Sequence, residues 1–359
     1  MTKRSVMNLD FPLYHTLSGF MRSYIPELDG VRAIAVLAVM IFHLGIFPIG
    51  WMGVPLFFVL SGYLITSILI DARSSPLKQY LSSFFWRRTV RIFPLYYAYL
   101  VVNLLLSLIA GLSLSGYAYF VFYLGNYRIG QLAPNVPGGV IGHLWSVAVE
   151  EQFYIVWPWL IYFTKRPVYL AVAAIFAAPI FRESLYNYTG NPYMTIVALP
   201  SCIDMLGAGA LVAMVKDRRI FLGMSLIGLS IIGYCLIKVP FTDFSDTEKW
   251  VPQAHIIFTG LGLLAAPAIS CASYAKILSN FVLRFIGKIS YGLYMWHLII
   301  FAIVHRMHLP FLYEVVISFA ASFFVAVVSW TYFEKFFLSF KDRWDYKSDR
   351  ESAPRVRTR

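Results

Sequence analysis

Charged residues are scarce in this sequence, and their scarcity excludes a soluble globular domain. Lys, Arg, Asp and Glu make up 13% of the 359 residues, whereas hydrophobic residues make up 59% and the mean hydropathy is +0.67. A soluble domain usually has about 25% charged residues. Several windows instead exceed the ~18 apolar residues that cross a bilayer. The predicted fold class is therefore all-α, a polytopic membrane protein.

Cysteine is also rare, which excludes two further classes. Cys202, Cys235 and Cys271 have no close spacing and lie in or beside apolar runs. We therefore expect buried thiols, with neither a disulfide framework nor a metal site. Because the sequence has no ligand cluster of the usual spacing elsewhere, no metal is predicted.

A cleavable signal peptide and a second soluble domain are not expected either. No compact apolar core precedes Arg22, so the first membrane helix is expected to act as the insertion signal. We expect three parts. They are a cytoplasmic N-terminal segment over 1–23, a membrane domain over 24–338 and a charged cytoplasmic tail over 339–359.

Apolar segments predict about ten transmembrane helices. The region 112–142 is the exception, because its apolar middle is too short to span and is followed by Pro and Gly residues. We interpret it as a re-entrant or interfacial element. The ten segments lie near 31–47, 51–71, 92–111, 144–164, 168–181, 197–215, 220–237, 253–272, 289–305 and 311–334.

The distribution of basic residues predicts the orientation in the membrane. If 112–142 enters and leaves on one side, both termini are cytoplasmic and 25 of the 30 Lys and Arg residues lie inside. A full span at 112–142 would move the basic cluster at 216–219 outside. The net charge of +12 therefore reflects topology, with membrane lipids and not nucleic acid as the partner. The residues left outside are Arg128, Arg182, Lys238, Lys249 and Arg306.

Arg32 and His43 stand out within the first predicted helix. Eleven residues apart, they share a face to within ~20° and lie ~16 Å apart along the axis. The imidazole is the group here that exchanges a proton near neutral pH, and intramembrane ionisable groups tend to mark sites. The equal alternative is a snorkelling boundary arginine and a histidine satisfied by a neighbouring helix.

The loop 76–91 predicts an interfacial helix at the cytoplasmic face. Its apolar residues follow helical spacing, and Arg87, Arg88 and Arg91 cluster at its end. Arginine forks match phosphate oxygens in pairs, so the cluster is interpreted as a phosphate clamp. Contact with lipid headgroups is the alternative.

Two adjacent carboxylates, Glu150 and Glu151, lie inside the apolar segment 144–164, with no basic residue within a turn. They are ~100° apart around a helix, so at most one points squarely at a given partner. His143, Glu150 and Tyr154 fall near one face. The structural alternative is a carboxylate satisfied by an arginine of another helix.

Three more polar residues within apolar stretches are weaker candidates for substrate contact, together with Glu151. Asp204 sits in a glycine-rich stretch near the outer side, and Tyr291 and His297 open the ninth predicted span. For His297, a hydrogen bond to a neighbouring helix that has only a structural role is at least as good an interpretation.

Five motifs together resemble the integral-membrane acyltransferase-3 family. They occur in the family's order from residue 24 to about 334, and the resemblance is to the membrane domain only. It implies an enzyme that transfers an acyl group, usually acetyl from cytoplasmic acetyl-coenzyme A. The usual acceptor is a sugar hydroxyl of a surface polysaccharide, lipopolysaccharide or related glycoconjugate. The motifs are LDGVRAIAVLAVMIFH, GVPLFFVLSGYLI, RRTVRIFPLYY, LWSVAVEEQFYIVWP and ISYGLYMWH.

The resemblance also assigns residues. The family's essential arginine and histidine fall on Arg32 and His43, and its arginine-x-x-arginine pair falls on Arg88 and Arg91. Its acidic position falls on Glu150. The chain departs from the family at Pro55, where an acidic residue is common, so no carboxylate of the second helix is expected to act.

The resulting hypothesis places acyl-coenzyme A at the cytoplasmic face, with its phosphates near Arg88 and Arg91. His43 would act as general base on an acceptor hydroxyl that enters from outside through 112–142, and Glu150 would orient His43 or stabilise its protonated form. An acyl-histidine intermediate or a relay is the alternative to direct transfer. The expected partners are acyl-coenzyme A, a carbohydrate or glycolipid acceptor and the lipids of the inner (plasma) membrane. A transporter of a glycan or lipid intermediate, which makes no bond, is the alternative.

Overall fold

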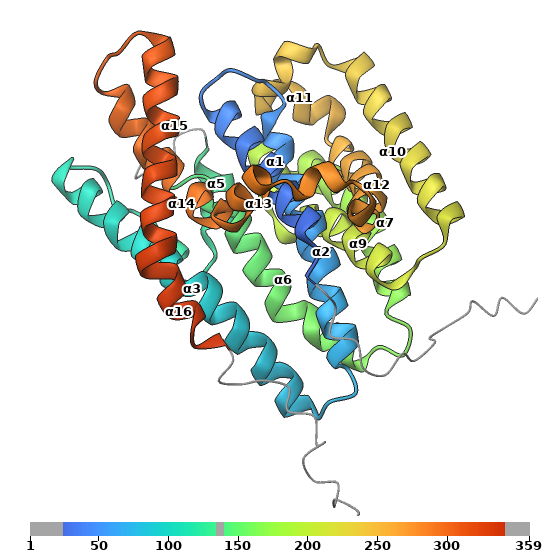
Figure 1. Cartoon of the computed structure of the whole chain (residues 1–359). Coiled ribbons are helices and arrows are strands. Elements are labelled where there is room, and N and C mark those ends of the chain that lie inside the picture. Colours follow the sequence, from blue (N-terminus) through green and yellow to red (C-terminus); the bar gives the residue numbers. More distant parts are fainter. Residues whose placement is uncertain (1–23, 134–139, 342–359) are drawn as a thin grey trace, which may run out of the picture.

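The structure is a computed structural model that describes residues 24–133 and 140–341. The predicted N-terminal segment 1–23 and most of the predicted tail 339–359 lie outside the described residues. Within the described part the chain is helical and contains no strand (Figure 1), which confirms the all-α prediction.

The longer helices are α1 Pro26–His43, α2 Gly53–Ala72, α3 Leu77–Ile109, α6 Leu144–Phe163, α7 Val168–Thr189, α9 Leu199–Met214, α10 Arg218–Lys238, α12 Ile257–Ser270, α14 Ser290–His305 and α15 Phe311–Val328. Shorter helices are α4 Tyr117–Val121, α5 Gly125–Leu132, α8 Pro192–Val197, α11 Thr247–Ala254, α13 Phe281–Lys288 and α16 Lys335–Leu338. Single turns include the 3₁₀ turns η1 Gly50–Met52 and η2 Phe241–Ser245, and the π-helical turn η5 Ser329–Glu334 joins α15 to α16.

Long apolar helices make this a multi-pass membrane protein. Among the described residues, six helices are long and apolar enough to cross a bilayer, or up to eight if α11–α12 and α13–α14 each form one bent span. The bends are 78° and 69°. Helices α1 and α6 fall outside this set, and both carry ionisable residues that the sequence singles out. The structure therefore supports six to eight spans, against the ten predicted.

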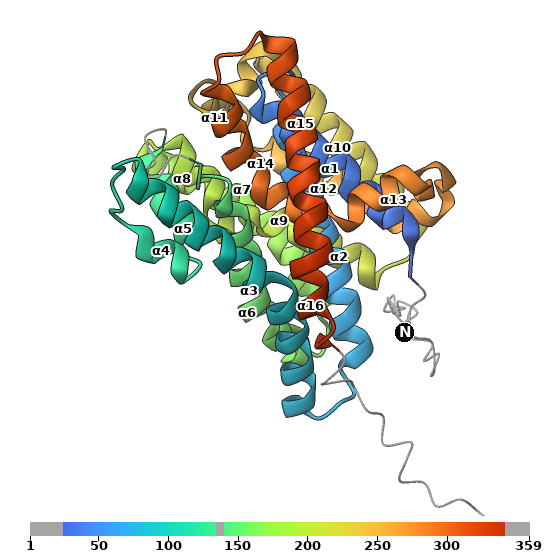
Figure 2. The same ribbon diagram turned by 60° about the vertical axis from the view of Figure 1, so that its left-hand side comes forward.

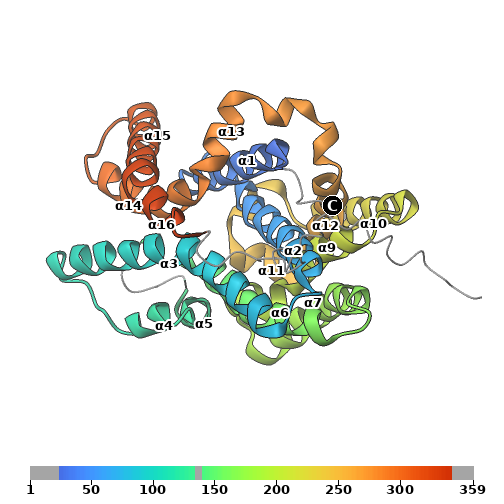
Figure 3. The same ribbon diagram turned by 60° about the horizontal axis from the view of Figure 1, so that its bottom comes forward.

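Helices α2 and α9 form the centre of the bundle. Helix α9 packs against α2, α7 and α12, while α10 and α15 stand at opposite edges (Figures 1 and 3). Gly62 and Gly209 allow α2 and α9 to approach closely, because a Cβ at either glycine would collide with a backbone carbonyl of the other helix. Gly53 plays the same part against α1.

Helix α3 corrects the prediction of an interfacial helix over 76–91. The chain runs as one helix from Leu77 to Ile109 and passes through Pro94 without a break. Its first turns do not lie free at a lipid surface, because Tyr80 and Phe84 are fully buried and the Tyr80 hydroxyl donates to the Pro158 carbonyl of α6 at 3.1 Å. Tyr80 and Phe84, two of the apolar residues that predicted an interfacial helix, instead pack against α6.

The described part of 112–142 contains only α4 and α5, each far too short to cross a membrane, as the sequence predicts. In Figure 2 both lie beside α3, on the side away from α13. One cysteine prediction is wrong. Cys202 and Cys235 are buried, but Cys271 is exposed in the turn that follows α12, where the apolar run has ended.

Candidate active site

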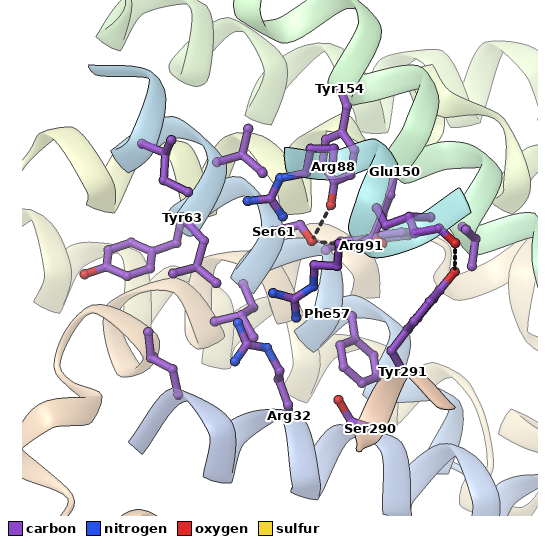
Figure 4. Close-up of a pocket in the computed structure, with 18 of the residues that line it drawn as sticks. Arg32, Phe57, Ser61, Tyr63, Arg88, Arg91, Glu150, Tyr154, Ser290 and Tyr291 are labelled. Carbon is purple, nitrogen blue, oxygen red and sulfur yellow. Dashed lines mark hydrogen bonds between the residues drawn. The ribbon is translucent and has the colours of Figure 1, made fainter. Parts of the chain in front are cut away.

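Five of the predicted site residues, four of them charged, line one cavity of about 460 Å³, which we call the arginine cavity. Arg32 comes from α1, Arg88 and Arg91 come from α3, and Glu150 comes from α6. Figure 4 shows the three guanidinium groups directed into the same space. Residues from three separate motifs, between position 32 and position 150, therefore converge.

Arg32 is held in place by its own helix. Its guanidinium forms an ion pair with the carboxylate of Asp29, three residues earlier on the same face. Asp29 also accepts a hydrogen bond from the hydroxyl of Tyr24. The Arg32 side chain is 18% exposed and that of Asp29 is 6% exposed. A buried carboxylate thus fixes the direction of a guanidinium that faces the cavity.

Arg88 and Arg91 have no such counter-ion. No carboxylate of the described residues forms an ion pair with either guanidinium, and the buried Nε of Arg88 has no hydrogen-bond partner there. Arg88 lies over the rings of Phe84 and Tyr154, at 5.9 and 5.7 Å from their centroids. Two guanidiniums with unused donors beside an open cavity form a site for an anion.

Glu150 belongs to the arginine cavity and does not contact His43. Its carboxylate accepts a hydrogen bond from Ser61 of α2, and the Ser61 oxygen lies 3.2 Å from the Tyr154 hydroxyl (Figure 4). The expectation that Glu150 orients His43 is therefore wrong, because the side chains of His43 and Glu150 line different cavities. Glu150 instead places a carboxyl group in the cavity that three arginines line.

His43 lines a second cavity of about 140 Å³, the histidine cavity. His43 ends α1 and is exposed, whereas His143, which precedes α6, is buried in the same cavity wall. Trp51 of η1 and Trp250 of α11 complete the aromatic part of the wall. No described residue of 112–142 lines this cavity, so entry of an acceptor through that region has no support here.

The partner that orients His43 is His297 of α14. The His297 Nδ1 lies 2.7 Å from the Tyr294 carbonyl oxygen, so this nitrogen carries the hydrogen and donates. In neutral His297 the Nε2 is then an acceptor, and it lies 3.0 Å from Nδ1 of His43. His43 must therefore donate through Nδ1, which leaves its Nε2 with a free lone pair. Such an imidazole has the tautomer of a general base.

Three side chains separate the two cavities. Val54, Phe58 and Tyr294 line both of them, so the cavities share a wall one side chain thick. The Tyr294 hydroxyl donates to the His143 carbonyl at 2.8 Å and lies 2.6 Å from the Ser146 oxygen. A group that reaches the inner end of the arginine cavity is thus adjacent to the cavity of His43.

Asp204 lies in neither cavity. Its carboxylate forms an ion pair of 2.7 Å with Arg182, and both side chains are at most 1% exposed. Thr259 donates to the same carboxylate at 2.7 Å, and Arg182 also donates to the Ser201 carbonyl. This network joins α7, α9 and α12. It corrects the placement of Arg182 in an outer loop, because the guanidinium is fully buried in the bundle.

We expect Asp204→Ala to destabilise the protein strongly, because it leaves the Arg182 guanidinium buried without its counter-ion. Breaking a buried pair in this way costs about 3–5 kcal/mol. Asp204→Asn, which retains a hydrogen-bond acceptor, should cost less. The measurement is the thermal unfolding midpoint in detergent.

Glu183→Ala serves as the control for this prediction, since Glu183 follows Arg182 on α7 and its side chain, which is 60% exposed, pairs with His255 at the end of α11. Exposed pairs contribute about 0–1 kcal/mol. Equal unfolding midpoints for Asp204→Ala and Glu183→Ala would contradict a stabilising role for the buried network.

The two remaining candidates are Tyr291 on α14 and Glu151 on α6. Tyr291 lines the arginine cavity and donates to the Ile92 carbonyl at 2.9 Å. Glu151 is buried outside both cavities, and its Oε1 has no hydrogen-bond partner among the described residues. Their roles in substrate contact stay predictions.

Three features of the site were not predicted from the sequence. They are the contact of Asp29 with Arg32, the contact of Ser61 with Glu150, and the position of His143 in the histidine cavity. Asp29 had a usable signal, because opposite charges three residues apart on a helix pair with each other. Ser61 and His143 had none, since their positions depend on how α2 and α6 pack. Among the described residues, no group of three His, Cys, Asp or Glu side chains could hold a metal ion, despite the three clustered histidines.

The long apolar helices define a multi-pass membrane protein, and its arginines, a carboxyl group and a histidine line two adjoining cavities inside the bundle. Residues 25–333 match the family described as "Acyltransferase domain". The chain belongs to this acyltransferase family.

Relatives with a named activity agree with the family. The chain is 30% identical over 373 residues to "Peptidoglycan O-acetyltransferase OatA" of Listeria monocytogenes, covering 90% of this chain and 59% of that protein. It is 29% identical over 353 residues to "Putative peptidoglycan O-acetyltransferase YrhL" of Bacillus subtilis, covering 87% and 54%. It is 30% identical over 317 residues to "O-acetyltransferase OatA" of Staphylococcus aureus, covering 79% and 52%.

The chain therefore spans between half and three-fifths of the length of these relatives. No solved structure matches it.

Proposed function

We propose that this protein is a membrane O-acetyltransferase that moves an acetyl group from acetyl-coenzyme A to a hydroxyl of a cell-envelope glycan. The observation that carries the proposal is the pair of cavities that meet at one wall. One has arginines without counter-ions, and the other has a histidine whose tautomer is that of a base. The names of the relatives support acetyl transfer to a glycan.

The arginine cavity is the proposed donor site. Coenzyme A carries a pyrophosphate and a third phosphate, and bidentate arginine–phosphate contacts are strong and directional. Arg88 and Arg91 would bind these phosphates, with Arg32 in the wall of the same cavity. The pantetheine arm would follow the apolar lining from α1 and α2 and present the thioester at Val54, Phe58 and Tyr294.

His43 is the proposed general base. Its Nε2 takes the proton of the acceptor hydroxyl, whose oxygen attacks the thioester carbon. The carbon–sulfur bond then breaks, and the protonated His43 returns the proton to the thiolate of coenzyme A. The ring is held by His297, which also stabilises the protonated form through the Nδ1 hydrogen bond.

We propose that α11–α12 and α13–α14 each form one bent span and that α1 and α6 also span the membrane. Two spans added to these eight give the ten that the sequence predicts. The ionisable residues of α1 and α6 line the two cavities or pair inside the bundle, except Glu151, which is buried outside both cavities. The excess of basic residues supports a cytoplasmic location for both termini, and we propose that the arginine cavity opens on the same side of the inner membrane.

His297→Phe should lower acetyl transfer by about 10–100-fold, the usual cost of removing a group that orients a functional histidine. The variant keeps an aromatic ring but removes the acceptor of the Nδ1 hydrogen bond of His43. His297→Gln retains an acceptor and should recover part of the rate. If both variants transfer acetyl as the wild type does, His297 does not set the tautomer of His43.

The proposal is tested by incubating membranes that contain the protein with radiolabelled acetyl-coenzyme A. Wild-type membranes should release free thiol and incorporate base-labile label into envelope polysaccharide, and membranes without the protein should not. Binding of coenzyme A by the purified protein is measured in parallel. Absence of both binding and thiol release would overturn the proposal and favour a transporter.

A further inference from the structure

We propose that the histidine cavity is the binding site for one sugar ring of the acceptor, held by the aromatic wall of Trp51 and Trp250 and hydrogen-bonded by His143. The inference rests on the proposed acetyl transfer. It adds which residues bind the acceptor and from which side it enters.

The aromatic wall is pre-formed. The rings of Trp51 and Trp250 stack with centroids 4.8 Å apart and an angle of 4° between their planes. Phe258 packs edge-on against both, at 5.5 and 5.6 Å. The Trp51 indole N–H donates to the Phe244 carbonyl at 2.9 Å, which fixes the ring relative to η2. Rigid aromatic surfaces of this kind suit the C–H faces of a pyranose ring, which are apolar.

His143 supplies the second argument. It is only 4% exposed, lines the cavity, and neither ring nitrogen has a hydrogen-bond partner among the described residues. The carbonyls of Val140 and Met295 lie near the ring, but neither makes a hydrogen bond of good geometry with it. A buried polar group left unpaired costs about 1–3 kcal/mol. A ligand hydroxyl that reaches this ring would pair with it.

A sugar hydroxyl satisfies either tautomer of His143, because a hydroxyl both donates and accepts. His143 is also close to the base: its ring centroid lies 5.3 Å from that of His297, which in turn bonds to His43. A ring with one hydroxyl on His43 would therefore place a neighbouring oxygen within reach of His143. Ser245 and Thr247 add two further hydroxyls at the rim.

The size and position of the cavity agree with this occupant. Its 140 Å³ holds about five water molecules at ~30 Å³ each, which is the scale of one sugar ring and far below that of acyl-coenzyme A. Its wall uses α11 and the turn between α1 and α2, which lie at the top of Figure 1, whereas α3 begins at the bottom. The acceptor would thus enter past residues 241–250, on the side opposite the start of α3.

The test compares two products in membranes supplied with radiolabelled acetyl-coenzyme A. One is base-labile acetate bound to envelope polysaccharide, and the other is free acetate from hydrolysis. His143→Phe keeps an aromatic ring but loses both nitrogens. It should lower the ratio of bound to free acetate by about tenfold or more, the effect of losing one such hydrogen bond. His143→Gln should recover part of the ratio, and Trp51→Leu should also lower it.

Trp159→Leu is the matched control, because Trp159 is 43% exposed on α6 and lines neither cavity. Its ratio should equal that of the wild type. Purified His143→Phe must still bind coenzyme A, which excludes misfolding. An unchanged ratio in both His143→Phe and Trp51→Leu overturns the inference. The inference is also overturned if bound and free acetate fall equally in His143→Phe while coenzyme A binding is retained. His143 would then be needed for the reaction of the acetyl donor and not for binding the acceptor.

Failure of this inference and failure of the proposed function look different. If the wild type hydrolyses acetyl-coenzyme A but labels no polysaccharide, the acceptor site is wrong while donor chemistry stands. If the wild type neither binds coenzyme A nor yields either product, the proposed function itself fails.

Discussion

His43→Asn should lower acetyl transfer by about 10²–10⁴-fold, the usual contribution of a general base. The physical reason is the loss of the Nε2 lone pair, which the hydrogen bond to His297 leaves free to accept a proton. Coenzyme A binding should be unchanged, because His43 lines the histidine cavity and the proposed phosphate site lies in the other one. The measurement is transfer of radiolabelled acetyl to envelope polysaccharide, with coenzyme A binding by calorimetry.

His308→Asn is the matched control for this variant. His308 is an exposed histidine between α14 and α15 with a positive φ of 51°, which asparagine accommodates readily. Its activity should equal that of the wild type. A His43→Asn protein that binds coenzyme A and transfers acetyl at the normal rate would show that another group takes the proton.

Arg88→Ala should weaken coenzyme A binding by about 10–100-fold, since a hydrogen bond to a charged group contributes about 1.5–3 kcal/mol. Arg91→Ala should have a similar effect, and the double variant should bind more weakly than either. Arg88→Lys should recover only part of the affinity, because a lysine lacks the planar fork that matches two phosphate oxygens. Direct binding of coenzyme A to the purified variants measures all four cases.

Arg87→Ala is the control on the same helix, because Arg87 is adjacent to Arg88 but does not line the arginine cavity. It should bind coenzyme A as the wild type does. If Arg88→Ala and Arg87→Ala bind equally well, the phosphates do not contact this cluster, and contact with lipid headgroups becomes the better explanation of the arginines.

The residues of the arginine cavity could be predicted because each carries its own signal. An arginine, a carboxylate or a histidine is conspicuous within an apolar run, and the motif order groups Arg32, Arg88, Arg91 and Glu150. The structure brings these four side chains to one cavity. The all-helical class could be predicted from composition. A long apolar segment in lipid must pair its backbone N–H and C=O groups internally, which an α-helix does.

The relation between His43 and its partners could not be predicted from the sequence. His43 and His297 are 254 residues apart, and their contact depends on how α1 and α14 cross. Reasoning from helical faces grouped His143 with Glu150. The N-terminal end of α6 instead places His143 in the histidine cavity, two turns away from the carboxylate. Helical periodicity predicts which residues share a face of a helix. It does not predict at which level along the helix a residue of another helix contacts that face.

The predictions of an interfacial helix over 76–91 and of an outer position for Arg182 were wrong for a related reason. Both predictions treated charge or an amphipathic stripe as a mark of the membrane boundary. In the structure, Tyr80 and Phe84 pack against α6, and Arg182 pairs with Asp204 in the interior. Tertiary partners that are distant in sequence decided both cases.

The central claim is that acetyl leaves a cytoplasmic donor in the arginine cavity and reaches an acceptor on the other side of the membrane. The most direct test supplies radiolabelled acetyl-coenzyme A to sealed inverted vesicles and to sealed right-side-out vesicles that contain the wild-type protein. Inverted vesicles should consume the donor and accumulate polysaccharide-bound label in the lumen, whereas right-side-out vesicles should be inactive until permeabilised. Activity in sealed right-side-out vesicles, or label that stays on the donor side in inverted ones, would contradict the account.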